Sequence, residues 1–315
     1  MAIVKTSIAG WSREKWELDR QSRKTIGGSD AGAVLGLSKY ASPYSLWAQK
    51  VGLVHPDDLS DSEAVRLGND LEEYVAKRFT EATGKKLKRD NHIITNTEYP
   101  WAHANVDRLV VGEPDAGFEA KTTSSWDVLK QCREGDFPAT WYCQVTHYMM
   151  VTGAKRWYLG VLVFGHGFFH FVIERKESEI EALAAAEREF YQRVIEGVPP
   201  DTDGSEATTK ALREIYRDSE ATSIDLLPVE IAVRTYTELG NQIKELERKR
   251  DEAQTEIMGY MQESEIGMLG GQKVVSWKTQ AGRKSFDKAA FEKDCGKIPE
   301  KYYKVGAPSR VFRVK

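Results

Sequence analysis

The side chains best suited to hydrolytic chemistry are an aspartate and a Glu-Ala-Lys tripeptide within the stretch WAHANVDRLVVGEPDAGFEAKTTSS. Asp107 ends one apolar run, a turn follows, and a second short run ends in Glu119-Ala120-Lys121. Because side chains two apart on a strand share a face, we expect Glu119 and Lys121 to line one cavity, with Asp107 brought beside them by the hairpin. Two carboxylates and an ammonium suit a hard divalent cation and a water to be activated. The alternative is a solvated pair of charges on a strand.

A helix expected upstream carries a further acid. The spacing of apolar side chains over residues 63–83 is close to helical, at Val65, Leu67, Leu71, Val75 and Phe79. Glu72 lies in the middle of this helix, one turn after Gly68, and so small a residue leaves room beside the glutamate for a ligand. The alternative is that Glu72 and Glu73 are both surface charges, and we keep that interpretation for Glu73.

A second expected helix, residues 139–152, is mostly apolar and contains one glutamine. Gln144 has Trp141 three residues before it and Tyr148 four residues after it, so all three lie on one helical face. This favours a glutamine that is buried or faces a site. Two strands should follow, around a turn at Gly165-His166-Gly167.

The segment RKTIGGSDAGAVLG places a Gly-Gly-Ser-Asp turn ahead of a run of small residues. Ser29 or Asp30 is expected to cap a helix that begins near Ala31. Free backbone N–H groups, a hydroxyl and the nearby Arg23 would suit a phosphate. A plain capped helix start is the alternative, and it is the better interpretation of these residues alone.

Taken in order, four segments resemble the YqaJ-type phage recombinase nucleases, relatives of the lambda-type 5′→3′ exonucleases in the PD-(D/E)xK nuclease superfamily. The segments are RKTIGGSDAGAVLGLSKYASPYSLWAQKVGL, LGNDLEEYVAKRF, NVDRLV with GFEAKTTSS, and WYCQVTHYMMVTG, and they span roughly residues 20–175. The resemblance implies an α/β fold, with a restriction-endonuclease-like core whose mixed central sheet is flanked by helices. Beyond the part that the resemblance covers, we expect a C-terminal helical and basic α/β extension.

The resemblance also implies a metal site that holds one or two Mg²⁺ ions, with Mn²⁺ as an alternative. In it, Asp107 bridges the metals, Glu119 is the second acid, and the carbonyl of Ala120 is a further ligand. Glu72 completes the metal shell. Lys121 orients or deprotonates the attacking water.

Further roles follow from the same resemblance. Gln144 matches the glutamine that borders the site, and Arg23 and Ser29 look like the pair that engages a terminal phosphate. The spacing from Arg23 to Ser29 is one shorter than in the lambda-type enzyme. The literal Pro-Asp of the superfamily name is absent, since residues 105–107 read Asn-Val-Asp, and Pro114-Asp115 falls in the turn between the strands.

Composition excludes several other classes. Three cysteines at scattered positions show neither metal spacing nor a disulfide pattern, which favours a reducing cytosol. The resemblance implies that this is the cytosol of a bacterial cell or phage-infected host. The six histidines are scattered, which argues against zinc. Apolar runs are too short for a membrane span, no signal peptide precedes the first expected helix, and there is no Gly-rich Lys-Ser/Thr loop for ATP.

The distribution of charge reconciles DNA binding with a net charge of −3. Residues 271–315 hold twelve Lys/Arg and four Asp/Glu, a local charge of +8, which leaves −11 for the other 270 residues. Aromatic residues alternate with this basic charge, a composition that can follow phosphates and stack on bases. The cations expected to contact DNA include Lys278, Arg283, Lys284 and Arg310. The alternative is a small α/β appendage with an aromatic core of its own.

The chain is expected to divide into a nuclease core (1–195), a linker (196–209) and an extension (210–315). The extension should contain a helical hairpin or coiled-coil-like segment, then a basic hairpin and tail. A 4,3 apolar rhythm from Leu239 to Tyr260, broken by Arg250, predicts a long helix with a seam. This helix could pair with residues 208–219 or with another subunit.

The leading functional interpretation is a Mg²⁺-dependent DNA exonuclease that resects linear duplex ends 5′→3′ for recombination. An endonuclease on the same core is one alternative. A non-catalytic DNA-binding or assembly protein is another, but the presence of Asp107, Glu119 and Lys121 argues against it. Besides double-stranded DNA, the resemblance implies a phage or prophage setting, a single-strand annealing protein as partner, and a homo-oligomer such as the ring of lambda-type relatives.

Overall fold

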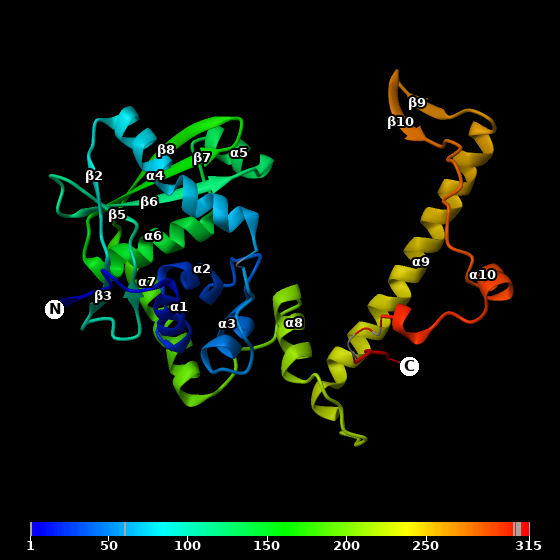
Figure 1. Cartoon of the computed structure of the whole chain (residues 1–315), viewed down its shortest axis with the longest axis horizontal. Helices are drawn as coiled ribbons and strands as arrows, with labels where there is room; N and C mark the ends of the chain where they lie inside the picture. The colour runs from blue at the N-terminus through cyan, green and yellow to red at the C-terminus, as the bar shows by residue number, and fades with distance from the viewer. Residues whose placement is uncertain (1, 60, 305, 307–309, 315) are drawn as a thin grey trace. The chain divides into compact units, whose positions relative to one another are not determined.

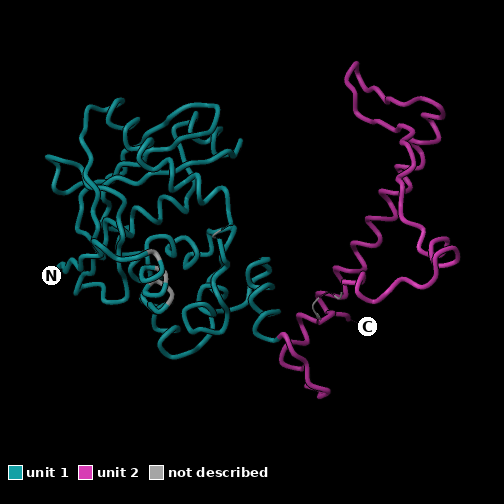
Figure 2. Tube along the Cα trace, viewed as in Figure 1, with its two compact units in different colours: residues 1–216 teal, residues 217–315 magenta. Residues whose placement is uncertain are grey.

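The structure is a computed structural model that describes residues 2–59, 61–304, 306 and 310–314 (Figure 1). Residues 1–216 and 217–315 form two compact units, and each is described by itself (Figure 2). No helix in the described part of the chain is long and apolar enough to cross a membrane.

The core of the first unit is a five-stranded sheet with the strand order β2-β5-β6-β7-β8. β6 and β7 are parallel, whereas the other neighbours are antiparallel, so the sheet is mixed. A second sheet has the order β1-β3-β4. The strands are β1 (Ile3–Ser7), β2 (Leu87–Arg89), β3 (His92–Asn96), β4 (His103–Ala104), β5 (Arg108–Val110), β6 (Ala116–Thr123), β7 (Arg156–Val163) and β8 (Gly167–Glu174).

Helices cover both faces of the five-stranded sheet (Figure 1), because the strands at its centre are apolar on both sides. On one face, α4 (Glu63–Thr83) buries Val75 and Phe79 against Phe118 of β6. On the other face, α6 (Ala139–Thr152) and α7 (Glu177–Glu196) share a large apolar core with Trp157 and Leu159 of β7. The expected fold class, an α/β core with a mixed central sheet flanked by helices, is confirmed.

Shorter helices complete the first unit. They are α1 (Arg13–Ser22), a 3-10 turn η1 (Gly28–Asp30), α2 (Ala31–Val34), α3 (Pro43–Lys50), α5 (Trp126–Arg133) and α8 (Glu206–Ile215). The helix expected near Ala31 is therefore only four residues long. Asp30 stands at its N-cap position, but neither Asp30 nor Ser29 supplies a capping side chain, because the Asp30 carboxylate accepts from Gly27 N–H and pairs with Lys50 instead.

The division between the units falls after α8, and not within residues 196–209. α8 is packed on α3, where the hydroxyls of Thr208 and Ser42 share a buried hydrogen bond of 2.7 Å. Ala211 of the same helix is buried as well. These contacts make α8 part of the first unit.

The second unit contains a long helix and little buried surface. Its elements are η2 (Leu227–Val229), α9 (Glu230–Met261), β9 (Ile266–Leu269), β10 (Gln272–Ser276), α10 (Lys288–Cys295) and η3 (Glu300–Tyr302). Among its described residues, Met261 is the only buried one. Phe286 and Phe291 contact each other with ring centroids 5.3 Å apart, yet both remain exposed, so the aromatic residues form no buried core in the described part of this unit.

Candidate active site

The register of β5 and β6 sets the position of Asp107. Arg108 pairs with Phe118 and Leu109 with Gly117, so the antiparallel ladder continues to Asp107 opposite Glu119. Asp107 therefore stands directly before β5, not at the end of a strand as the apolar run suggested. Its Oδ2 accepts a hydrogen bond of 3.0 Å from the Ala120 N–H, which holds the carboxylate at the edge of β6.

Lys121 and Gln144 complete the cluster of side chains around Asp107 and Glu119. Glu119 and Lys121 lie on the same face of β6, and the Lys121 ammonium donates to Glu119 Oε1 at 2.8 Å. It also donates to Gln144 Oε1 at 2.8 Å, while Gln144 Nε2 donates to Glu119 Oε1 at 2.8 Å. Because the ammonium only donates and the carboxylate only accepts, these two partners fix the orientation of the glutamine amide. The four side chains from the three segments 107, 119–121 and 144 thus meet in one place.

The carboxyl groups of Asp107 and Glu119 are close enough for the charge of Glu119 to affect the pKa of Asp107. Burial, and then the negative charge of Glu119, raise the pKa of Asp107 to about 8, against the lowering effect of the Ala120 N–H and of Lys121. Glu119 itself is 3% exposed, and no donor among the described residues reaches its Oε2. The donors of the site therefore do not allow both carboxyls to be ionised together at neutral pH.

A divalent cation would supply the missing positive charge. The free Oε2 of Glu119, the Asp107 carboxylate and the Ala120 carbonyl are hard oxygen ligands, which fit Mg²⁺ or Mn²⁺ better than zinc. The described residues contain no group of three or more His, Cys, Asp and Glu side chains close enough to hold a metal by themselves. A backbone carbonyl and several waters must therefore complete the shell, which matches the way Mg²⁺ is bound in proteins.

Glu72 lies near the acid pair but is tied to an arginine that the sequence analysis missed. Arg108 is buried, with 4% of its surface exposed, and its Nη2 donates to Glu72 at 2.9 Å and to Glu73 at 3.0 Å. Burial first, and then the charge of Asp107, raise the pKa of Glu72, although Arg108 opposes both effects. The signal was available, because a residue directly after Asp107 on a strand must point to the opposite face, towards α4.

The arginine and the serine expected to engage a terminal phosphate occupy different surroundings. Arg23 pairs with Asp19 and, with Thr25 and His103, helps to line a small hollow. Burial, and next the charge of Arg23, lower the pKa of His103 to about 3, so its imidazole is neutral at pH 7. Ser29 is exposed in the 3-10 turn.

The Gly-Gly-Ser-Asp turn is nevertheless packed against the helix that carries Gln144. A Cβ on Gly28 would lie 2.4 Å from the Tyr148 ring, so only glycine allows this approach. The Tyr148 hydroxyl in turn accepts from Gln144 Nε2 at 2.8 Å. The position of the turn is therefore coupled to the cluster at Glu119 and Lys121.

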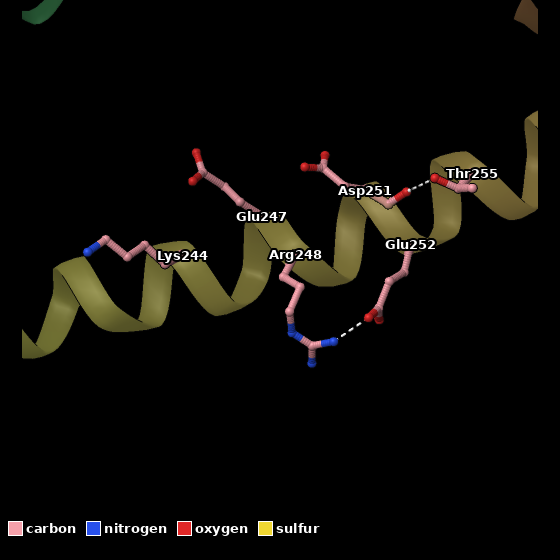
Figure 3. A pocket seen from close by; sticks show the side chains of 6 residues that line it. All are labelled: Lys244, Glu247, Arg248, Asp251, Glu252 and Thr255. Atoms are coloured by element: carbon pink, nitrogen blue, oxygen red, sulfur yellow. Dashed lines mark hydrogen bonds and ion pairs between the residues drawn. The ribbon is translucent and has the colours of Figure 1, made fainter.

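The basic residues singled out near the C-terminus, Lys278, Arg283, Lys284 and Arg310, belong to the second unit and are exposed. Lys278 lies 3.6 Å from Glu265. A surface hollow of this unit lies on α9 and is lined by that helix alone, from Lys244 to Thr255 (Figure 3). Its charged side chains are solvated, and it has no buried carboxylate comparable to that of Glu119 in the cluster beside β6.

Comparisons with known proteins agree with this assignment of the core. Residues 15–155 match the YqaJ-like viral recombinase domain. The chain is similar to YqaJ of Bacillus subtilis (strain 168), with 38% identity over 272 residues that cover 85% of this chain and 83% of that protein.

Two solved structures are more distantly similar. One is an alkaline exonuclease (LHK-Exo) from Laribacter hongkongensis, with a TM-score of 0.48, 19% identity, and coverage of 59% of this chain and 94% of that chain. The other is a phage related exonuclease from Haemophilus somnus 129PT, with a TM-score of 0.43, 12% identity, and coverage of 55% and 96%. From the domain match and from the extent of its identity to the Bacillus protein, this chain belongs to the YqaJ-like viral recombinase family.

Proposed function

We propose that this protein is a divalent-metal-dependent deoxyribonuclease that resects linear duplex DNA ends 5′→3′ during phage-type recombination. The observation that carries the proposal is the close pair of the half-buried Asp107 and the buried Glu119, which their donors do not allow to ionise together at neutral pH, with Lys121 hydrogen-bonded to Glu119. Membership of a viral recombinase family and similarity to proteins named as exonucleases support the choice of substrate and reaction.

The acids would hold Mg²⁺ or Mn²⁺, one ion or two. Asp107, Glu119 and the Ala120 carbonyl are the proposed ligands, and Glu72 would join them by leaving Arg108. When bound, such an ion lowers the pKa of a coordinated water and offsets the charge of the phosphate that this water attacks.

Lys121 and Gln144 would position the reacting groups. The Lys121 ammonium lies where it can donate a hydrogen bond to the attacking water or to a phosphate oxygen. Gln144 holds this ammonium beside Glu119 by bonding to both. Because the glutamine is also bonded to Tyr148, a shift of α6 would change the direction in which the ammonium points.

Recognition of the DNA end is a separate part of the proposal. Arg23 and Ser29 are the proposed ligands of a terminal phosphate, although Ser29 is exposed and Arg23 now pairs with Asp19. The basic tail is proposed to hold DNA through phosphate contacts. A single-strand annealing protein as partner stays a prediction from the family resemblance.

Cleavage of linear and closed circular duplex DNA in Mg²⁺ tests the proposal. We expect linear DNA labelled at the 5′ end to be digested from that end while circles remain intact. Nicking of circles would indicate an endonuclease, and binding without cleavage would indicate an assembly protein. Glu119→Gln and Lys121→Ala should abolish cleavage while DNA binding is largely kept, and unchanged rates in both variants would remove these residues from the mechanism.

A further inference from the structure

Helix α9 carries an apolar seam that its own unit does not bury. Seam positions with a 4,3 spacing run from Val229, directly before the helix, to Tyr260, and Arg250 is the only charged residue among them. Four successive seam residues at the centre, Tyr236, Leu239, Ile243 and Leu246, are between 50% and 64% exposed. A sustained heptad of this kind is the pattern of a helix that packs on another helix along its length.

The opposite face of α9 is polar and is satisfied by contacts within the helix. Arg248 pairs with Glu252 (Figure 3). Arg248 also donates to Glu245 at 2.8 Å. Such pairs stabilise a solvated helix face. α9 is therefore polar towards solvent on one side and apolar on the other.

The described residues of the chain offer no helix that could cover this seam. α9 has 32 residues, a length of about 48 Å. α4 has 21 residues and α7 has 20, and both bury their apolar faces within the first unit. α8, the partner suggested by the sequence, has 10 residues and packs on α3. Phe312 of the tail contacts one seam residue, Tyr236, which remains 55% exposed.

We propose that α9 pairs with the α9 of a second copy of this chain as an antiparallel two-helix coiled coil. A second copy supplies a helix of equal length with the same apolar repeat. In a parallel pair in register, Arg250 would face Arg250 of the partner subunit, and Lys249 would flank both at the same level. Like charges so close in an interface are unfavourable.

The antiparallel arrangement removes this repulsion. When the two helices overlap along their whole seam, Val229 lies opposite Tyr260 of the partner subunit and Ala232 opposite Ile257 of the partner subunit. The two Arg250 side chains are then about 16 Å apart along the axis, from the rise of an α-helix. Each arginine faces the other copy's seam near Leu239, where its aliphatic stem can pack and its guanidinium can reach solvent.

Mass measurement by light scattering after size exclusion tests the pairing. The wild-type protein should have twice the chain mass of 35.6 kDa. Ile243→Glu combined with Leu246→Glu should reduce the mass to that of one chain, whereas Asn241→Glu combined with Lys244→Glu, outside the seam, should leave it doubled. A monomeric wild type at about 100 μM, or an assembly that the seam variant does not dissociate, would overturn the proposal. Circular dichroism and cooperative thermal unfolding of both variants check that the first unit is folded, whether or not the protein cleaves DNA.

Cysteine crosslinking tests the orientation. In a Cys295→Ser background, which removes the exposed cysteine, a mixture of Ala232→Cys and Ile257→Cys chains should oxidise to a mixed dimer. Ala232→Cys alone should not crosslink to itself, because its two copies would lie near opposite ends of the coiled coil. Efficient self-crosslinking of Ala232→Cys, without the mixed dimer, would show a parallel pair and contradict the antiparallel proposal.

Discussion

Asp107 and Glu119 face each other in a site where only Glu119 has an ammonium partner and one of its oxygens has no described donor. This arrangement disfavours two ionised carboxylates and raises the pKa of Asp107 to about 8. A bound divalent cation would have the opposite effect, because it stabilises the ionised form of both acids. At the scale of single residues, the site is therefore better suited to a metal-bound than to a metal-free state.

Arg108 is predicted to stabilise the fold as well as restrain Glu72. Arg108→Met should lower the free energy of unfolding by about 1–3 kcal/mol, because it leaves Glu72 beside Asp107 without a partner. Arg89→Met is the matched control, since Arg89 is 58% exposed and bonds only to the exposed Glu73 among the described contacts. Its effect should be below about 1 kcal/mol in urea unfolding. Equal effects of the two substitutions would contradict the prediction.

His103 is predicted to make stability depend on pH. Its pKa is about 3 in the folded protein and 6.5 ordinarily, so the unfolded chain binds more protons between these values. Stability should therefore rise as the pH increases from about 3 to 6.5, by roughly 1.4 kcal/mol for each unit of pKa difference. Unfolding midpoints of wild type and His103→Gln should converge towards acid pH, and parallel curves over this range would rule out a neutral buried His103.

At the scale of elements, the hairpin β5–β6 and the helix α6 determine which side chains meet. The period of two on β6 predicted that Glu119 and Lys121 share a face, and the helical period predicted that Gln144 and Tyr148 share another. The sequence could not reveal which strand residues pair, and the register alone places Asp107 opposite Glu119. The sequence analysis gave no end for the helix near Ala31, and α2 ends just before Gly36, whose φ of 68° stops an α-helix.

The close contact between η1 and α6 is predicted to tolerate no side chain. Gly28→Ala should lower stability by about 1–3 kcal/mol and reduce cleavage, because the new methyl group would push Tyr148, and with it Gln144, away. Gly68→Ala provides the control, since its Cβ would meet only Thr122 Oγ1 at 3.6 Å and alanine favours the helix. Denaturant unfolding that ranks the two variants in the opposite order would refute this packing argument.

At the scale of the whole molecule, the fold of the first unit could be predicted from the sequence, whereas the residue at which that unit ends could not. The α/β fold of the first unit follows from strongly apolar strands and amphipathic helices, which a sequence displays directly. The end of that unit could not be predicted in the same way, because the Pro- and Gly-containing segment at 196–209 runs into a helix, α8, that packs on α3. Local composition carries no information on such packing.

The basic tail is predicted to contribute salt-dependent DNA binding. Glutamine in place of Lys278, Arg283, Lys284 and Arg310 should reduce the slope of log affinity against log salt concentration by about 0.9 for each lost phosphate contact. The control replaces four cations of α9 in the same way, namely Arg234, Lys244, Arg248 and Lys249. Fluorescence anisotropy with labelled duplex measures both slopes, and identical slopes would show that the tail makes no contact with DNA.

The most direct test of the account is the location of a divalent ion in a crystal grown with Mn²⁺, found by anomalous scattering. The account predicts a peak at coordination distance from the carboxylates of Asp107 and Glu119 and from the Ala120 carbonyl, and its loss in Glu119→Gln crystals. A crystal that binds Mn²⁺ elsewhere and shows no peak between these oxygens would contradict it.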